Sequence, residues 1–209
     1  MTRPEDLTAR ARIRDAALAL FAERGIAAAT IRDIAQAAGV SSGLLRHHFG
    51  SKEGLREACD QYAMAELAKI QAEFVEQGRL SEQSLLGTVH PGMLLLQRYL
   101  VQSTMDGSAA GAQMFDRMVE SGERWLAGTK LVSADPRAYA ATLVAMQLGM
   151  YSLQAELSRS LGTDVSEPAG RARMLKAAIE IFAQPLITPE QAAQARAAMD
   201  RLTAPEETP

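Results

Sequence analysis

The sequence predicts an all-α protein, in which a three-helix helix-turn-helix head precedes a larger body that is a bundle of helices. Composition is the first reason: alanine is abundant, methionines number 10 and aromatic residues make up 5%, a mixture that favours helices over sheets. Apolar residues also recur with the helical spacing of three and four along most of the chain. Finally, glycines, prolines and capping residues divide these stretches, and no alternating strand pattern is found between them.

The first fifty residues are predicted to form three short helices. The first covers residues 7–24, where apolar residues at i, i+3, i+4, i+7 and i+8 make one face. Thr30 begins the second, with Asp33 in the capping-box position. The residues that end or cap these helices are, in order, Gly25, Thr30, Gly39, Ser41 and Gly50. A tight turn with glycine between two short helices is typical of the helix-turn-helix motif, whose second helix enters the major groove of DNA.

The short helix that follows Ser41 is predicted to have a buried side and an exposed side. Leu45 and Phe49 are four residues apart and can anchor it to the core. The residues expected to point outward are Ser42, Gly43, Arg46 and His47. A metal site at His47 and His48 is not expected, because adjacent histidines point in different directions on a helix and no cysteine or third histidine is near them in sequence.

A long fourth helix is predicted from Lys52 to about Gln77, and the remainder is helical as well. Residues 78–84 form a break, and residues 85–102 are either two helices or one helix kinked at Pro91. Further helices are expected over residues 109–130, 135–161, 167–184 and 188–202, followed by a disordered tail.

Charge and cysteine content restrict the classes of function. Residues 1–58 carry nine Lys and Arg against seven Asp and Glu, whereas the remainder carries thirteen against eighteen. A basic head on an acidic body indicates nucleic-acid contact at one end. Cys59 is the only cysteine, which fits a reducing, cytoplasmic setting. We expect no signal peptide and no membrane span, since the uncharged stretch 138–155 contains too many polar residues.

An enzyme is not expected. The sequence has no glycine-rich phosphate loop, no nucleophile elbow and no cluster of carboxylates or histidines in the body. No cofactor and no metal are expected either. A further alternative is an architectural or adaptor protein that uses the same helix-turn-helix without a ligand. A closed apolar cavity with a few polar groups in the body would favour a ligand sensor, and a solidly packed body would favour this alternative.

The stretch "ALALFAERGIAAATIRDIAQAAGVSSGLLRHHFGSKEGL", residues 17–55, resembles the tetracycline-repressor (TetR/AcrR) family of bacterial transcription regulators. The order of elements is also similar. The resemblance implies a homodimer that binds a palindromic, double-stranded DNA operator and is released by an unidentified small-molecule effector, with repression more expected than activation. It also implies a DNA-binding domain over 1–55, a ligand-binding and dimerisation domain over 56–203 and a tail over 204–209.

The resemblance and the helix pattern together suggest the DNA-binding residues. These are Thr30, Arg32, Ser41, Ser42, Gly43, Arg46, His47, His48 and Lys52. Lys52 opens a helix where its ammonium group can meet a phosphate, and the helix N-terminus itself favours anions. The sequence differs from the family pattern at Leu44, where a phosphate-binding hydroxyl residue is common, and at Arg46, where tyrosine is typical. Arg46 can bind a phosphate or a guanine edge.

Two sets of residues are predicted in the body from the same resemblance. The ligand pocket is expected to include Met93, Gln97, Arg98, Met118, Trp125, Gln147 and Tyr151. If Arg98 faces inward, the ligand should be anionic, and if it faces water, the ligand should be neutral and apolar. The alternative is that these methionines, Gln147 and Tyr151 belong to a packed core. The dimer interface is expected along the apolar stripe of the 167–184 helix, formed by Ala172, Leu175, Ile179 and Phe182. This helix and the 135–161 helix would pair with the same two helices of a second copy as a four-helix bundle.

Overall fold

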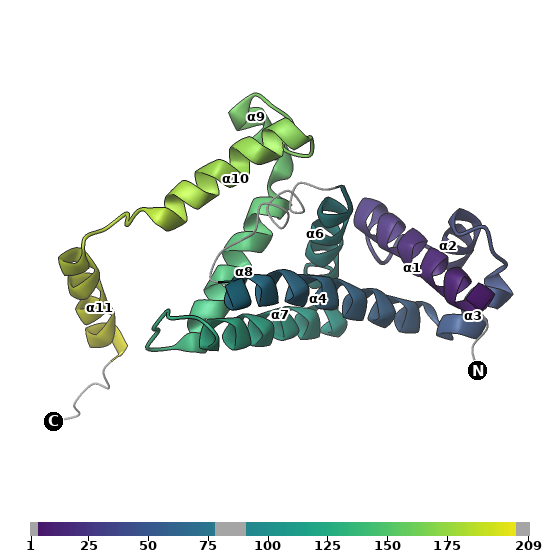
Figure 1. Cartoon of the computed structure of the whole chain (residues 1–209), viewed down its shortest axis with the longest axis horizontal. Coiled ribbons are helices and arrows are strands. Elements are labelled where there is room, and N and C mark those ends of the chain that lie inside the picture. The colour runs from purple at the N-terminus through teal and green to yellow at the C-terminus, as the bar shows by residue number, and fades with distance from the viewer. Residues whose placement is uncertain (1–3, 78–90, 204–209) are drawn as a thin grey trace.

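The computed structural model describes residues 4–77 and 91–203, and this part of the chain is helical without strands (Figure 1). The helices are α1 (Pro4–Arg24), α2 (Ile31–Ala37), α3 (Ser42–Phe49), α4 (Lys52–Gln77), α6 (Pro91–Thr104), α7 (Ala109–Ala127), α8 (Pro136–Ser152), α9 (Gln154–Leu161), α10 (Pro168–Ala183) and α11 (Pro189–Thr203). The all-α prediction is confirmed. No helix within these two ranges is long and apolar enough to cross a membrane.

Local capping signals form the head as predicted. Asp33 and Thr30 make a capping box at the start of α2, in which the Asp33 backbone N–H donates to Thr30 Oγ1 and the Thr30 N–H donates to Asp33 Oδ2, each at 3.2 Å. Ser41 Oγ accepts from the Leu44 N–H at 3.1 Å at the start of α3. Gly39 in the turn has φ of 65°, a left-handed conformation that favours glycine. These bonds position α3 across α2.

Helix α4 joins the head to the body, as Figure 1 shows. Its start lies so close to the end of α3 that a Cβ at Gly54 would collide with the Phe49 carbonyl oxygen. Leu55 and Cys59 on α4 are fully buried, and they belong to one apolar cluster that runs from Ile13 in α1 to Leu148 in α8. The predicted domain boundary between residues 55 and 56 therefore falls inside α4, where head and body share a core.

The body differs from the sequence prediction at one clear point. The single helix expected over 135–161 is wrong, because the chain turns at Leu153 and divides into α8 and α9. Ser152 Oγ donates to the Leu148 carbonyl at 2.7 Å, and hydroxyl bonds of this type bend helices. Gly162 ends α9 in the left-handed region, which favours glycine. The alternatives for residues 85–102 are not decided, since 78–90 lie outside the described residues, as does the predicted tail 204–209.

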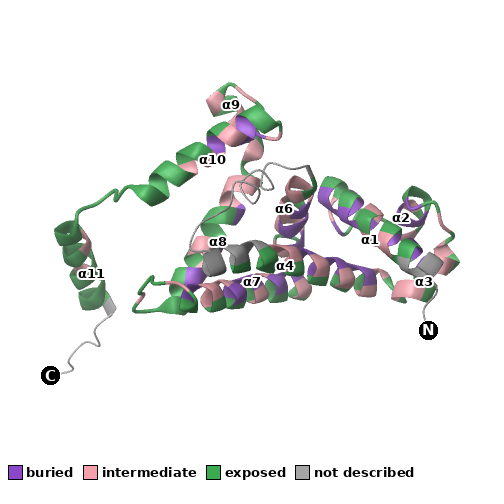
Figure 2. Ribbon diagram, in the orientation of Figure 1, coloured by how far each residue is buried: buried purple, intermediate pink, exposed green. Residues whose placement is uncertain are grey.

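Helices α10 and α11 extend away from the rest of the chain, with α11 farthest out (Figure 1). Figure 2 shows that most of their surface is exposed. Within the stripe predicted for the dimer, Ala172 and Leu175 are half-buried, whereas Ile179 and Phe182 are 56% and 59% exposed. Apolar side chains farther along are exposed as well: Ile181, Leu186, Ile187, Met199 and Leu202. These two helices thus present an apolar surface that their own chain does not cover.

Candidate DNA-binding surface and ligand pockets

Helix α3 presents the predicted polar face to solvent. Arg46 and His47 are exposed, and so is Gly43, while Leu45 is fully buried beneath them. Ser42 is half-buried, so its side chain lies at the edge of this face. An exposed arginine and histidine one residue apart on a short, anchored helix can donate hydrogen bonds to base edges or phosphates.

The C-terminal end of α3 is held on α1 by an arginine that the sequence prediction did not include. The Arg10 guanidinium lies over the Phe49 ring, 4.9 Å from its centroid, and donates to the His48 carbonyl at 3.4 Å. His48 is half-buried, and its Nε2 is buried without a hydrogen-bond partner among the described groups. The rings of His47 and His48 meet edge to face, with centroids 5.4 Å apart. His47 is therefore the more accessible of the two.

The remaining predicted DNA contacts occupy the rim of this face. Arg32 is exposed near the start of α2. The Thr30 and Ser41 hydroxyls are exposed, but both already serve as helix caps. Lys52 Nζ donates to the Ala27 carbonyl at 2.9 Å, which ties the start of α4 to the loop before α2. An ammonium group has three donors, so Lys52 retains two for a phosphate.

A buried polar network connects α4 to α6 and α7, and we call it the junction. Its residues are Arg56, Asp60, Tyr99, Ser103, Asp106 and Ser108. Arg56 Nη1 donates to Asp106 Oδ2 at 2.8 Å and to Ser108 Oγ at 2.9 Å, and its Nη2 donates to the Ser103 carbonyl at 2.8 Å. The guanidinium thus bridges the start of α4 to the α6–α7 turn.

Asp60 is the anionic centre of the junction. It is 2% exposed and accepts from the Tyr99 hydroxyl at 2.6 Å and from Ser103 Oγ at 2.8 Å. Arg56 Nε lies 3.8 Å from its other carboxylate oxygen. Burial is the main reason why the pKa of Tyr99 is raised, and the charge of Asp60 adds to it, so the hydroxyl stays a donor. The spacing of Arg56 and Asp60, four residues apart on a helix, was the one sequence signal for this network.

Cys59, next to the junction, is an inert part of the core. Its thiol is fully buried, and this burial raises its pKa. A thiol in such a setting is neither a nucleophile nor a ready target of oxidation.

The seven residues predicted for the ligand pocket do not come together. Met118 is buried in the apolar core, Gln147 is exposed, and Trp125 and Tyr151 are half-buried. Met93 and Arg98 line two separate cavities. Gln97 is half-buried, with its Oε1 buried and unbonded among the described groups. Gln147 and Tyr151 are on successive turns of α8, but the exposure of Gln147 shows that they do not share an inner wall.

Several clefts lie in the described part of the chain, and three of them are large enough to consider as ligand sites. One of about 660 Å³ lies between α6, α7 and α8, and its apolar lining includes Met105, Phe115, Ala145, Leu148 and Leu153. A second, of about 450 Å³, lies between the head and the body and is lined by Leu18, Tyr62, Met93, Leu95 and Leu96 among others. The third, of about 620 Å³, is more polar and includes Arg98, Gln154, Ser158, Thr163, Asp164 and Ser166. We call this third cavity the α6–α9 pocket. All three are within the size range of small-molecule sites.

Two family models match the chain. One, described as bacterial regulatory proteins of the tetR family, covers residues 13–59, and the other, described as a tetracyclin repressor-like C-terminal domain, covers residues 93–188. The HTH-type transcriptional regulatory protein RaaS of Mycobacterium tuberculosis (strain ATCC 25618 / H37Rv) is 34% identical over 196 residues, which are 90% of this chain and 85% of RaaS. The HTH-type transcriptional repressor KstR2 of Rhodococcus jostii (strain RHA1) is 59% identical over 46 residues, 22% of each chain.

Solved structures resemble the fold over most of its length. A TetR-family protein from Rhodococcus sp. superposes with a TM-score of 0.60 at 24% identity, covering 84% of this chain and 98% of its own. GusR of Salmonella enterica gives a TM-score of 0.54 at 23% identity, covering 82% and 90%. At these identities the similarity concerns the arrangement of helices.

Proposed function

Because the chain belongs to the TetR family of bacterial regulatory proteins and is a DNA-binding transcriptional regulator, we propose that it represses transcription as a homodimer on a palindromic operator and is released by a small molecule. The observation that carries the proposal is the exposed face of α3 with Arg46 and His47, held on a buried Leu45. Its site of action is the cytoplasm, where bacterial DNA lies.

The proposal that two copies bind a palindromic operator follows from the size of α3. One helix of eight residues reads too few base pairs for useful specificity. Two copies related by a two-fold axis and about 34–36 Å apart would read half-sites one helical turn apart in successive major grooves. In each half-site His47 and Arg46 reach the bases or the phosphates, while Lys52 and the α4 N-terminus bind backbone phosphate.

The proposed dimerisation is supported by the uncovered apolar surface of α10. Ile179 and Phe182 are more than half exposed, and Leu175 is on the same helix one turn before Ile179. A monomer that exposed such a continuous stripe would be prone to associate. We propose that α10 pairs with α8 and with the same two helices of a second copy, through residues Ala172, Leu175, Ile179 and Phe182.

Release by a ligand needs a rigid connection between the body and the head, and α4 supplies it. The body has one shape in which the two heads fit the operator and another in which they lie too far apart. A ligand that binds the second shape more tightly than the first lowers operator affinity by that difference in binding free energy. Arg56 and Asp60 fix the head-proximal part of α4 to the α6–α7 turn, so a shift of α6 moves α4 with it. Open clefts of several hundred cubic ångströms beside α6 and α8 give such a ligand room to bind.

Operator binding is tested by three variants of the full chain. Lys52→Ala should weaken binding about equally for all sequences and lower the salt slope by about one charge. His47→Ala should instead relax preference at one position per half-site, by about 1–3 kcal/mol. If alanine at Arg46, His47 and Lys52 together leaves operator affinity unchanged in a folded protein, the assignment of α3 is wrong.

Dimerisation is tested separately. Leu175→Glu combined with Ile179→Glu should give monomers that no longer bind the operator, because two charges would face an apolar partner. Light scattering measures the mass directly. Lys176→Glu, an exposed position on the same helix, is the control that should remain dimeric. A wild-type chain that stays monomeric at micromolar concentration would contradict the proposal.

A further inference from the structure

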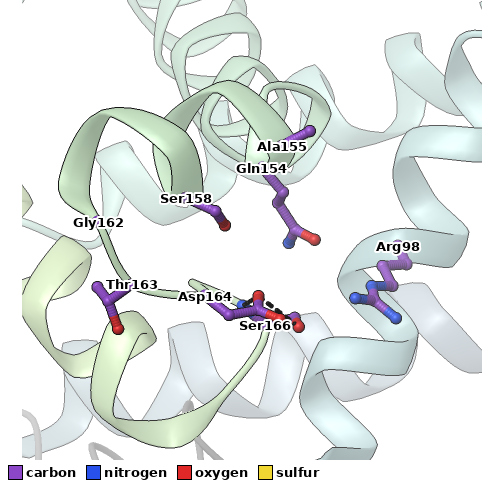
Figure 3. A pocket seen from close by; sticks show the side chains of 8 residues that line it. All are labelled: Arg98, Gln154, Ala155, Ser158, Gly162, Thr163, Asp164 and Ser166. Carbon is purple, nitrogen blue, oxygen red and sulfur yellow. Dashed lines mark hydrogen bonds between the residues drawn. The ribbon is translucent and has the colours of Figure 1, made fainter.

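The α6–α9 pocket brings polar side chains from three segments to one space. Arg98 comes from α6, Gln154 and Ser158 come from α9, and Thr163 and Asp164 come from the loop between α9 and α10. Figure 3 shows Arg98 reaching from α6 toward the loop and Gln154 extending from α9 into the space between them. A lining of this kind suits a ligand with several hydrogen-bonding groups rather than an apolar one.

The loop that forms one wall of this pocket is held in place by its own bonds. Ser158 Oγ accepts from the Val165 N–H at 3.0 Å, and Asp164 Oδ1 accepts from the Ser166 N–H at 2.8 Å and from its hydroxyl at 2.7 Å. Gly170 lets α10 approach the loop, because a Cβ there would collide with the Asp164 carbonyl. The wall is therefore preformed, which lowers the entropic cost of binding.

The positive charge of Arg98 is available in this pocket. Arg98 is exposed to the pocket opening and makes no hydrogen bond or ion pair with any group that the structure describes. Asp164 is the acidic residue of the lining, and hydrogen bonds from Ser166 lower the pKa of its carboxyl; the charge of Arg98 lowers it further, without a hydrogen bond between the two. The Arg98 guanidinium thus retains its paired donors for a carboxylate or a phosphate, which match its planar geometry.

A second guanidinium lies behind the loop and points to the same ligand class. Arg171 on α10 is 2% exposed, and its Nη2 donates to the Ser166 carbonyl at 2.8 Å. Within residues 4–77 and 91–203, its Nε and Nη1 are buried without a hydrogen-bond partner, and no carboxylate lies within 4.0 Å of it. Burial lowers the pKa of Arg171, and Arg98 is close enough to lower it further, although Tyr151 and Glu167 oppose this. An unpaired buried cation is costly, and an anion nearby would reduce that cost.

We propose that the α6–α9 pocket binds a small anionic effector, whose carboxylate or phosphate group accepts hydrogen bonds from Arg98 and is attracted by Arg171, while Gln154 and Thr163 bind its other polar groups. The inference rests on the proposed ligand-released regulator and names the chemical class of its effector. It replaces the predicted set of pocket residues with Arg98, α9 and the α9–α10 loop.

The test measures thermal unfolding of the full chain with three probes at millimolar concentration: succinate, inorganic phosphate and the neutral succinamide. A binding anion at one hundred times its Kd should raise Tm by about 5–10 °C, and succinamide should not. Arg98→Gln should weaken binding by roughly tenfold to a hundredfold. Arg159→Gln on α9 removes the same charge from an exposed position outside the lining, so it should bind as the wild type does.

The outcomes separate the site from the proposed function. A shift with succinate alone identifies a carboxylate ligand, and a shift with phosphate alone identifies a phosphorylated one. Equal shifts in Arg98→Gln and Arg159→Gln, or no shift with either anion, would overturn the anionic site. If binding depends on Arg98 but leaves operator affinity unchanged, the site stands and release by a ligand is wrong. If a neutral compound releases the operator equally well from the wild type and from Arg98→Gln, the proposed release by a ligand stands and the anionic site is wrong.

Discussion

Two buried arginines in this chain have opposite surroundings. Arg56 at the junction is 8% exposed and uses both terminal nitrogens for hydrogen bonds, with Asp106 and Asp60 within 4.0 Å. Arg171 beside the α6–α9 pocket is 2% exposed, yet it makes one hydrogen bond, to a carbonyl. Arg56 thus has two carboxylates close to it and leaves only its Nε without a hydrogen bond among the described groups, whereas Arg171 leaves both Nε and Nη1 without one. The same residue type is therefore neutralised in one region and left without a close carboxylate among the described residues in the other.

The difference has a physical reason. A buried charge costs several kcal/mol unless partners replace its water, and the junction supplies those partners from α4, α6 and the α6–α7 turn. The α9–α10 loop and its neighbours supply fewer partners: Glu167 acts on Arg171 through its charge without a hydrogen bond, and Tyr151, whose pKa is raised by burial, is neutral. The predictions below test this contrast, from the largest expected effect to the smallest.

Asp60→Ala should cost about 3–5 kcal/mol of the free energy of unfolding, because it leaves Arg56 buried without its central carboxylate. It also leaves the Tyr99 hydroxyl with only its longer contact, to the Arg56 carbonyl at 3.3 Å. Urea denaturation measures the loss. The control is Glu66→Ala on the same helix, which removes the carboxylate of the Lys69–Glu66 pair, in which Lys69 is mostly exposed. That variant should lose less than about 1 kcal/mol. Similar losses in the two variants would mean that the junction is no stronger than a surface pair.

Tyr99→Phe removes one bond from the junction and keeps the ring. The Tyr99 hydroxyl donates to Asp60 at 2.6 Å, and its ring packs 6.2 Å from that of Phe21. We expect a loss of about 1.5–3 kcal/mol, since the acceptor is charged and buried. The same urea titration applies. Tyr139→Phe, at an exposed position on α8, should be neutral, and a neutral Tyr99→Phe would show that Ser103 alone satisfies Asp60.

The junction also predicts a loss of stability at acid pH. Burial acts to raise the pKa of Asp106, but hydrogen bonds from Ser108 and the charge of Arg56 outweigh it, and the pKa lies below its ordinary value of 3.8. Because the pKa of Asp106 is lower in the folded protein than in the unfolded chain, this carboxylate stabilises the fold at any pH above the pKa of the unfolded chain. That stabilisation is lost as the pH falls through the pKa of the folded state. Stability should therefore decline below about pH 4. At pH 7, Asp106→Asn should be less stable than the wild type. Between pH 5 and 3 it should lose less of its free energy of unfolding than the wild type does, as measured by urea titration. An identical acid slope in both proteins would contradict this role.

Arg171→Met should change the stability of the ligand-free protein by less than about 1 kcal/mol, in either direction. It removes two unpaired buried donors and keeps an unbranched apolar chain in their place. Arg56→Met, the same exchange at the paired site, should instead lose several kcal/mol. Comparing the two variants in one urea series decides the contrast directly. If Arg171→Met is as damaging as Arg56→Met, then Arg171 has a structural partner and the pocket loses its second cation.

The sequence alone determined the parts of this protein that depend on near neighbours. The capping box of Thr30 and Asp33, the cap at Ser41 and the bounds of α4 were all predicted, because each depends on residues within one or two helical turns. The exposed face of α3 followed for the same reason, since helical periodicity places Arg46 and His47 opposite Leu45. These local features, together with the family resemblance, were enough to predict the fold class and the kind of function.

Only the tertiary structure decided which distant residues meet. The junction joins Arg56 to Ser103, Asp106 and Ser108, which are 47 to 52 residues away along the chain, and no periodicity reports such a pairing. The turn at Leu153 carries α9 and its loop to Arg98, which forms a cleft with residues that the predicted ligand set did not include. Whether a buried arginine is satisfied depends on which groups the fold brings within hydrogen-bonding distance, and those distances arise from the packing of whole helices.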